Sequence, residues 1–210
     1  MAWLSDWPYR RQIPIGKVDH GSALTDYQVP IEVWSDRQTT QVLEGSDYVE
    51  VDPNSHITRS SSPSRVSWNG LTSNEYANVC KSFGTDYFSG DFEHYLTLRV
   101  SAAAHSIIVY CWALTNSDSS LKEIKLASGD FLGLRFLNWS GAYWIQLEEV
   151  IDGGAANADT WTGAALDTTY YIRVKRNESI GTYGTLYADI YTSSADRDNE
   201  ENAVANLSVT

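Results

Sequence analysis

Residues 168–193, TTYYIRVKRNESIGTYGTLYADIYTS, contain two alternating segments on either side of a polar stretch. Every second residue is apolar or aromatic: Tyr170, Ile172 and Val174 in the first segment, and Leu186, Ala188 and Ile190 in the second. A period of two places such a set on one face of a β-strand. Residues 177–184 contain Asn, Ser and Gly, which tolerate turn dihedrals. The stretch predicts an antiparallel hairpin with one buried face and one exposed face whose tyrosines and charged residues suit binding.

The rest of the chain repeats this pattern. We expect further short strands at 9–15, 27–34, 48–51, 56–59, 65–68, 75–81, 92–100, 107–114, 131–137, 143–148 and 203–209, with loops at 152–167 and 196–202. Residues 107–114 are almost all apolar, which predicts a central strand covered on both faces. Short strands separated by turn signals, without a βαβ pattern, predict an all-β antiparallel sandwich or jelly roll.

Length and charge limit the function. The 210 residues fit one large β domain, and the formal charge of −12 disfavours nucleic acid and anionic membranes. No apolar run approaches the ~20 residues of a membrane span, so we expect no membrane insertion. The first residues lack the apolar core of a signal peptide. We therefore expect a virion component or a domain excised from a larger secreted protein, located outside the cell or on a virion surface.

Five segments carry a resemblance to a known fold family: YVEVD (48–52), FSGDFEH (88–94), WAL (112–114), YYIRVKR (170–176) and GTLY (184–187). In order and wording they resemble laminin-G modules of the uncharacterised phage and environmental type. The resemblance implies a concanavalin A-like jelly roll over residues 46–210. That fold hosts lectins, adhesins, lyases and glycosidases, so it does not choose a function.

The N-terminal segment carries a second resemblance. Trp7, the Tyr-Arg-Arg of 9–11 and the LTDYQV of 24–29 are similar to the opening of DUF2341-type extracellular modules. Pro14 and Pro30 lie within the expected strands and place them at a sheet edge, because proline cannot donate to a ladder. Residues 1–45 are expected to form a strand pair packed on, or extending, the sandwich.

The outward positions of the strands provide the candidate ligand site. They combine aromatic rings with planar polar groups: Tyr95, Arg135, Trp144, Gln146, Glu148, Tyr171, Arg173, Tyr187 and Asp189. Sugar recognition uses flat rings against the apolar ring face and paired hydrogen bonds to hydroxyls. In the resembling fold one sheet is concave and often takes sugars there. The alternative is an ordinary solvated face, which is built from the same residue types.

Calcium is the candidate cofactor. Asp196, Asp198 and Glu200 alternate in an expected acidic loop, and hard cations bind clustered oxygens. Laminin-G-like modules often hold one calcium at a sheet rim. The glycine and terminal glutamate of an EF-hand are absent, and an acidic surface loop is the alternative.

Catalytic patterns are weak. The paired carboxylates of glycosidases have no matching spacing here. His94 falls on the apolar side of its strand, which favours a satisfied core histidine over a catalytic one. Cys80 and Cys111 are read either as buried thiols or as a disulfide between neighbouring strands.

We therefore predict no enzyme. The first hypothesis is a carbohydrate-binding or adhesion module whose partner is a glycan or cell-surface polysaccharide. The second is a structural protein of a phage particle or surface filament that contacts copies of itself or other virion proteins. A fragment of a polysaccharide-active enzyme is the third.

Overall fold

The computed structural model describes residues 48–210 except 62–63, 73–74, 85–86 and 118, and these residues belong to one compact unit. The expected strands at 9–15 and 27–34, and the expected domain boundary at residue 45, lie outside the described residues. In the described part no helix is long and apolar enough to cross a membrane.

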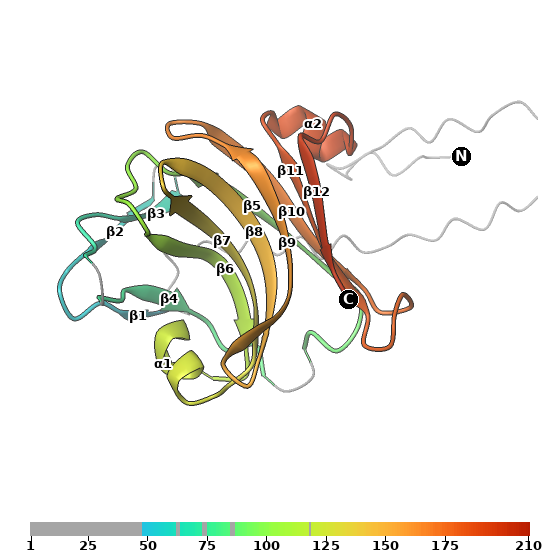
Figure 1. Ribbon diagram of the computed structural model, residues 1–210, viewed down its shortest axis with the longest axis horizontal. Coiled ribbons are helices and arrows are strands. Elements are labelled where there is room, and N and C mark those ends of the chain that lie inside the picture. The colour runs from blue at the N-terminus through green and yellow to red at the C-terminus, as the bar shows by residue number, and fades with distance from the viewer. Residues whose placement is uncertain (1–47, 62–63, 73–74, 85–86, 118) are drawn as a thin grey trace, which may run out of the picture. The chain divides into compact units, whose positions relative to one another are not determined.

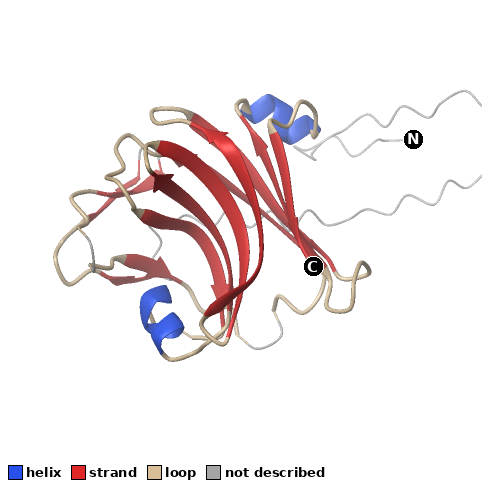
Figure 2. Cartoon of the chain, in the orientation of Figure 1, coloured by secondary structure: helices blue, strands red, loops and turns tan. Residues whose placement is uncertain are grey.

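Strands dominate the described residues, with two short helices (Figure 2). The strands are β1 (Val49–Val51), β2 (Ile57–Ser61), β3 (Ser64–Trp68), β4 (Asn78–Cys80), β5 (Phe92–Arg99), β6 (Ile108–Thr115), β7 (Phe131–Trp139), β8 (Ala142–Ile151), β9 (Gly154–Ala164), β10 (Thr169–Asn177), β11 (Thr185–Tyr191) and β12 (Ala205–Val209). The helices are α1 (Leu121–Leu126) and α2 (Ser194–Asn199).

Two four-stranded antiparallel sheets form the sandwich (Figure 1). Sheet A has the strand order β12-β11-β10-β5, and sheet B has the order β6-β7-β8-β9. The short pairs β1–β4 and β2–β3 are separate from both sheets. The predicted all-β antiparallel sandwich is confirmed, whereas the finer jelly-roll assignment stays a prediction.

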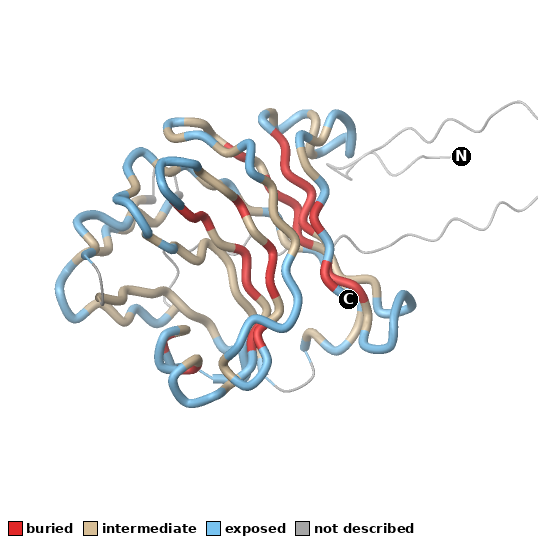
Figure 3. The backbone as a smooth tube through the Cα atoms, viewed as in Figure 1, coloured by how far each residue is buried: buried red, intermediate tan, exposed pale blue. Residues whose placement is uncertain are grey.

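The core lies between the two sheets, and buried segments run along their inner strands (Figure 3). It consists of Leu134, Phe136, Ile145, Leu147, Tyr170, Ile172, Val174, Leu186, Ala188, Ile190, Leu207 and Val209. The predicted hairpin is confirmed: β10 and β11 pair with Ile172 opposite Ile190 and Val174 opposite Ala188. The alternation also predicts the inward residues of β5, β7 and β8 correctly.

The prediction of a central strand at 107–114 is wrong. β6 lies at the edge of sheet B and, among the described strands, pairs only with β7. Its continuous apolar run is explained by a register shift between Tyr110 and Trp112, not by a central position in the sheet. A bulge adds a residue and breaks strict alternation. Consequently Cys111 and Trp112 both contact the core, while Tyr110 packs on the opposite face of the sheet.

Two of the expected loops contain regular structure. Residues 152–167 contain β9, which reads as a loop because its small and polar side chains suit an exposed edge strand. Asp152 and Gly153 connect it to β8 with positive φ values of 51° and 73°, the geometry of a tight hairpin turn. The expected acidic loop at 196–202 begins within α2, whose N-cap is Ser193.

The cysteines lie on different strands, Cys80 on β4 and Cys111 on β6, and do not form a disulfide. Cys111 donates a hydrogen bond to the carbonyl of Leu134 at 3.3 Å. Burial raises the pKa of its thiol to about 12. The sequence left free thiols and a disulfide as alternatives, and the structure contains two free thiols.

His94 is a core histidine. It faces inward from β5, where the indole Nε1–H of Trp112 donates to its Nδ1 at 2.8 Å. This bond ties an edge of sheet A to an edge of sheet B. Burial lowers the pKa of His94 from its ordinary value of 6.5. A proton on Nδ1 would remove the acceptor that Trp112 uses.

The depressed pKa makes stability depend on pH. The unfolded chain binds this proton more readily than the folded chain, so the free energy of unfolding should be full above about pH 6.5 and should fall below it. His94→Gln, which keeps an acceptor but does not titrate, should reduce the loss between about pH 7.5 and 5.5 in urea unfolding. His105→Gln is the matched control at an exposed position. An unchanged pH dependence in His94→Gln would contradict this assignment.

Candidate functional site on the outer face of sheet B

A row of four polar side chains crosses the outer face of sheet B. Strand register places Tyr110 opposite Arg135, Arg135 opposite Gln146, and Gln146 opposite Thr160, so each of the four strands contributes one member. We call these four residues the polar row. Arg135 donates from Nε to Gln146 Oε1 at 2.8 Å, and Gln146 donates from Nε2 to Thr160 Oγ1 at 2.6 Å. Arg135 also donates from Nη1 to the hydroxyl of Tyr110, so hydrogen bonds connect all four side chains of the polar row.

Glu148 lies beside the polar row on the same face of β8 and is fully buried. Arg135 Nη2 lies 2.9 Å from its Oε2, and Lys125 Nζ lies 3.7 Å from its Oε1. The hydroxyl of Tyr110 also donates to Glu148. A buried carboxylate needs such partners, because desolvation of an unpaired charge is costly. Two cations thus surround one carboxylate.

Tyr110 links the cations to the carboxylate. Its hydroxyl accepts hydrogen bonds from Lys125 Nζ and Arg135 Nη1, both at 3.2 Å. Burial and the hydrogen bond to Glu148 raise the pKa of Tyr110 well above its ordinary value, so the phenol stays protonated. It therefore acts as a neutral donor and acceptor inside a charged cluster.

Gly133 makes room for this tyrosine. A Cβ at position 133 would lie 2.9 Å from Cε1 of Tyr110 and 3.2 Å from Cε2 of Phe131. Gly133 is opposite Glu148 in the β7–β8 register. The missing side chain lets the ring of Tyr110 cross β7 and reach the carboxylate.

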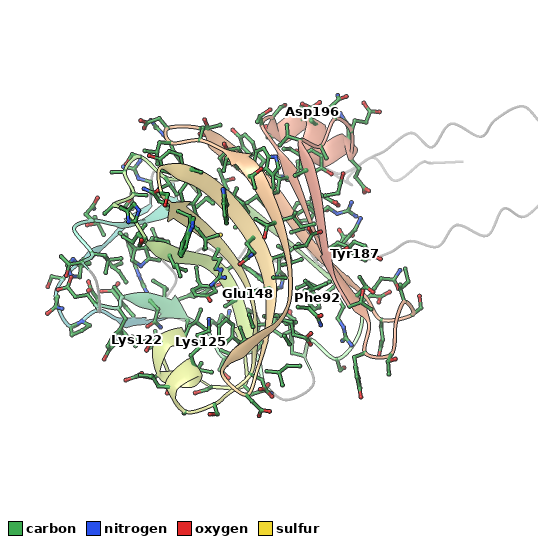
Figure 4. All side chains as sticks on the ribbon, in the orientation of Figure 1. Phe92, Lys122, Lys125, Glu148, Tyr187 and Asp196 are labelled. Atoms are coloured by element: carbon green, nitrogen blue, oxygen red, sulfur yellow. The ribbon has the colours of Figure 1, made fainter. Side chains whose placement is uncertain are left out.

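Helix α1 delivers Lys125. Ser120 and Glu123 form a capping box, in which the backbone N–H of Glu123 donates to Ser120 Oγ at 3.2 Å and the N–H of Ser120 donates to Glu123 Oε2 at 3.1 Å. Ile124 anchors the helix on Phe131 and Val150 of sheet B. Figure 4 shows Lys125 and Glu148 coming from these separate elements. The long strands of sheet B curve, and α1 lies inside the curve, so this outer face is concave (Figure 1).

The structure divides the predicted ligand residues between two faces. Arg135, Trp144, Gln146 and Glu148 share the outer face of sheet B, where Trp144 lies two residues from Gln146 and opposite Leu137. Tyr95, Tyr171, Arg173, Tyr187 and Asp189 belong to the outer face of sheet A. Tyr187 and Glu148 therefore lie on different sheets (Figure 4).

The sheet A face is less open than its sequence predicts. Arg173 and Asp189 are buried, as is Tyr191 next to them. Arg173 pairs with Glu93 and, at 2.5 Å, with Glu200 at the end of α2. Burial favours the neutral form of Glu93, but hydrogen bonds from Arg173 and Tyr95 hold its pKa below the ordinary value. The expected exposure is wrong for Arg173 and Asp189, which are buried and paired with charges of the same face.

Helix α2 contributes to this covering. The guanidinium of Arg197 lies 5.2 Å from the ring centroid of Tyr95 and 5.7 Å from that of Tyr171. On the other side of Arg173, Lys175 lies 3.2 Å from Asp189 and 5.5 Å from the ring centroid of Tyr187. All three predicted ligand tyrosines on this face therefore already lie within cation–π distance of cations of the same chain.

The three predicted calcium ligands diverge. Asp196 accepts from Asn202 at 3.0 Å, Asp198 pairs with Arg197 at 2.8 Å, and Glu200 pairs with Arg173. Within residues 48–210, apart from the gaps named above, no group of three or more His, Cys, Asp or Glu side chains is placed to hold a metal. Calcium binding stays a prediction.

The sequence did not indicate Tyr110 or Lys125 as site residues. Tyr110 is hidden within an apolar run whose register shifts at the bulge. Lys125 depends on α1, and the signal for that helix was present as the capping-box pattern Ser-x-x-Glu at 120–123. Recognising that pattern would have indicated the helix, but not the strand on which it packs.

Comparison with protein families, curated proteins and solved structures finds no match. The resemblances to laminin-G and DUF2341-type modules stay predictions.

The cluster predicts a strong response to loss of Glu148. Glu148→Gln leaves Arg135 and Lys125 facing each other without a carboxylate, and removal of one partner from a buried ion pair costs about 3–5 kcal/mol. We expect a loss of this order in urea unfolding. Arg135→Gln alone should also destabilise, and the double variant should lose clearly less than the sum of the two. Additive losses would show that the two groups are not coupled.

Proposed function

We propose that this chain is a non-catalytic carbohydrate-binding or adhesion module that uses the concave outer face of sheet B. The observation that carries the proposal is the polar row with Trp144 beside it. Planar amide and guanidinium groups recognise hydroxyls, and an aromatic ring takes the apolar face of a sugar. Four of the predicted ligand residues meet on this face, and register fixes their spacing.

Preorganisation supports this assignment. Arg135 and Gln146 are held by each other, by Tyr110 and by Thr160, so a ligand meets groups that are already oriented. Binding costs less when the side chains need not be ordered. Glu148 orients Arg135 through an ion pair and is itself buried, so it positions Arg135 and does not contact the ligand.

The same burial favours binding over hydrolysis. Glycoside hydrolysis uses two carboxyl groups that flank the scissile bond. Glu148 is fully buried and engaged by Arg135, Lys125 and Tyr110. It has no free access to a glycosidic oxygen.

A glycan-array and polysaccharide-retardation screen tests the proposal, first with calcium and then with EDTA. We expect binding to at least one glycan, and Trp144→Ala should weaken it about tenfold or more, as loss of a central aromatic contact does. Tyr187→Ala is the matched aromatic control on sheet A and should leave affinity unchanged. Loss of binding in EDTA would favour the predicted calcium.

Two results would overturn this proposal. The first is a chain that binds none of the glycans. The second is a chain whose binding depends on Tyr187 and not on Trp144, which would move the site to sheet A.

A structural subunit of a particle or filament is the second candidate, and β6 favours it. This eight-residue edge strand, IVYCWALT, contains no charge and no proline, the features that usually protect an edge from pairing. Ile108 at its start is half exposed. Such an edge suits addition of a strand from a second copy of the chain.

Oligomeric state distinguishes the two candidates. If β6 pairs between copies, light scattering after size exclusion should show an oligomer, and Ile108→Lys should shift it toward the monomer. Ile180→Lys, at a similarly exposed position in the β10–β11 turn, is the control. A monomer at all concentrations would contradict assembly through β6.

A further inference from the structure

A cleft opens at one end of the sandwich, between sheet A and sheet B. Its volume is about 270 Å³, and residues of both sheets line it, including Leu132 of β7, Glu149 of β8 and Leu186 of β11. Small-molecule sites span roughly 300–1,000 Å³. The cleft is therefore suited to a ligand about the size of a single ring. It is separate from the polar row, because Glu149 and Leu132 point to the opposite face of sheet B from Glu148.

The floor of the cleft is apolar. Leu132, Leu186 and Val209 line it, and all three belong to the core or pack against it. Leu186 and Val209 are themselves buried and Leu132 is partly exposed, so only a small apolar area of the core faces the cleft. An apolar ligand surface placed there would remove it from water, which is favourable.

The rim provides polar groups and one aromatic ring. Glu149, Asn157 and Arg176 lie around the opening, and Tyr183 stands in the β10–β11 turn with 84% of its surface exposed. A flat, exposed ring beside an apolar floor can contact the carbon face of a sugar.

The Nη groups of Arg176 and the side-chain amide of Asn157 already donate within the chain. Arg176 donates from Nη1 to the carbonyls of Phe88 and Ser89 at 3.2 and 3.1 Å, and from Nη2 to that of Tyr183 at 2.7 Å. Asn157 donates from Nδ2 to Glu149 Oε2 at 2.7 Å and to the carbonyl of Thr210 at 3.3 Å.

Acceptors remain. Among the contacts of the described residues, the second carboxylate oxygen of Glu149 and the amide oxygen of Asn157 receive no hydrogen bond. A ligand that fits must therefore donate hydrogen bonds at its edge and present an apolar surface to the floor. An ionised carboxylate cannot donate to these atoms, whereas the hydroxyls of a pyranose can donate and its carbon face is apolar.

We propose that this cleft is a second binding site, which takes one pyranose residue through hydroxyl donation to Glu149 and Asn157. The site stands independently of the sheet B face. A module with both sites would hold the body of a glycan on the concave sheet and a single sugar residue at the end of the sandwich.

Methyl NMR spectra of the full chain test this proposal. The probes are the methyl α-pyranosides of glucose, galactose and mannose, added to millimolar concentrations. At least one should shift the methyl signals of Leu186 and Val209 in a saturable way. Sodium butyrate, an apolar chain with a carboxylate, should not. The cleft is not a sugar site if no pyranoside shifts these signals, or if butyrate or butylammonium shifts them and the sugars do not.

Variants separate the cleft from the sheet face. Glu149→Ala and Tyr183→Ala should each weaken the pyranoside effect about fivefold or more, since each removes one recognition element. Trp144→Ala should leave it unchanged. A pyranoside effect that persists in both cleft variants would overturn the assignment. Failure of the cleft with intact Trp144-dependent glycan binding would remove only this inference.

Discussion

Apolar contact between two sheets is the constraint on which the described structure depends. Each inner strand gives every second side chain to the shared core, so the remaining side chains of that strand must point outward. The outward set cannot be distributed freely: register determines which of its members are neighbours. In sheet B the register aligns Tyr110, Arg135, Gln146 and Thr160 in a single row. The strand register that forms the core therefore also determines which residues of the candidate site are neighbours.

The two outer faces differ in how their charged side chains are paired. On sheet A, Arg173 is matched by Glu93 and Glu200, and Lys175 by Asp189, so cations and carboxylates are balanced. On sheet B two cations surround a single carboxylate, and neutral partners such as Gln146 and Tyr110 take up the remaining hydrogen bonds. A balanced face has little left to offer a ligand. The sheet B face instead places a guanidinium and an amide, already oriented by their neighbours, on the same face as Trp144, which is why the proposed function rests there.

Alternation alone predicts much of this arrangement. It gives the hairpin of β10 and β11, the inward residues of β5, β7 and β8, and the fact that Arg135, Gln146 and Glu148 lie outside the core. Alternation does not indicate which strands are neighbours, so it groups residues of two separate faces into one candidate site. It also fails at the β6 bulge, where one added residue moves Trp112 inward beside Cys111. Alternation does not predict edge strand β9, because that strand has few apolar residues, although Asp152-Gly153 is a strong hairpin signal. Arg173 pairs with Glu200 at the end of α2, and Asp189 accepts a hydrogen bond from Asn206 of β12. No local pattern of β10 or β11 contains these partners.

Gly133 has a consequence for how such proteins vary. The ring of Tyr110 occupies the volume that any larger residue at 133 would need. The two positions therefore cannot change independently: a side chain at 133 requires a smaller residue at 110, and the carboxylate at 148 then loses a partner. These three positions, on three different strands, are therefore expected to vary together. In related sequences, glycine, tyrosine and glutamate should be present together or absent together at these positions. Sequences that contain all three would keep the charged concave face, and sequences that lack all three would have a different surface there.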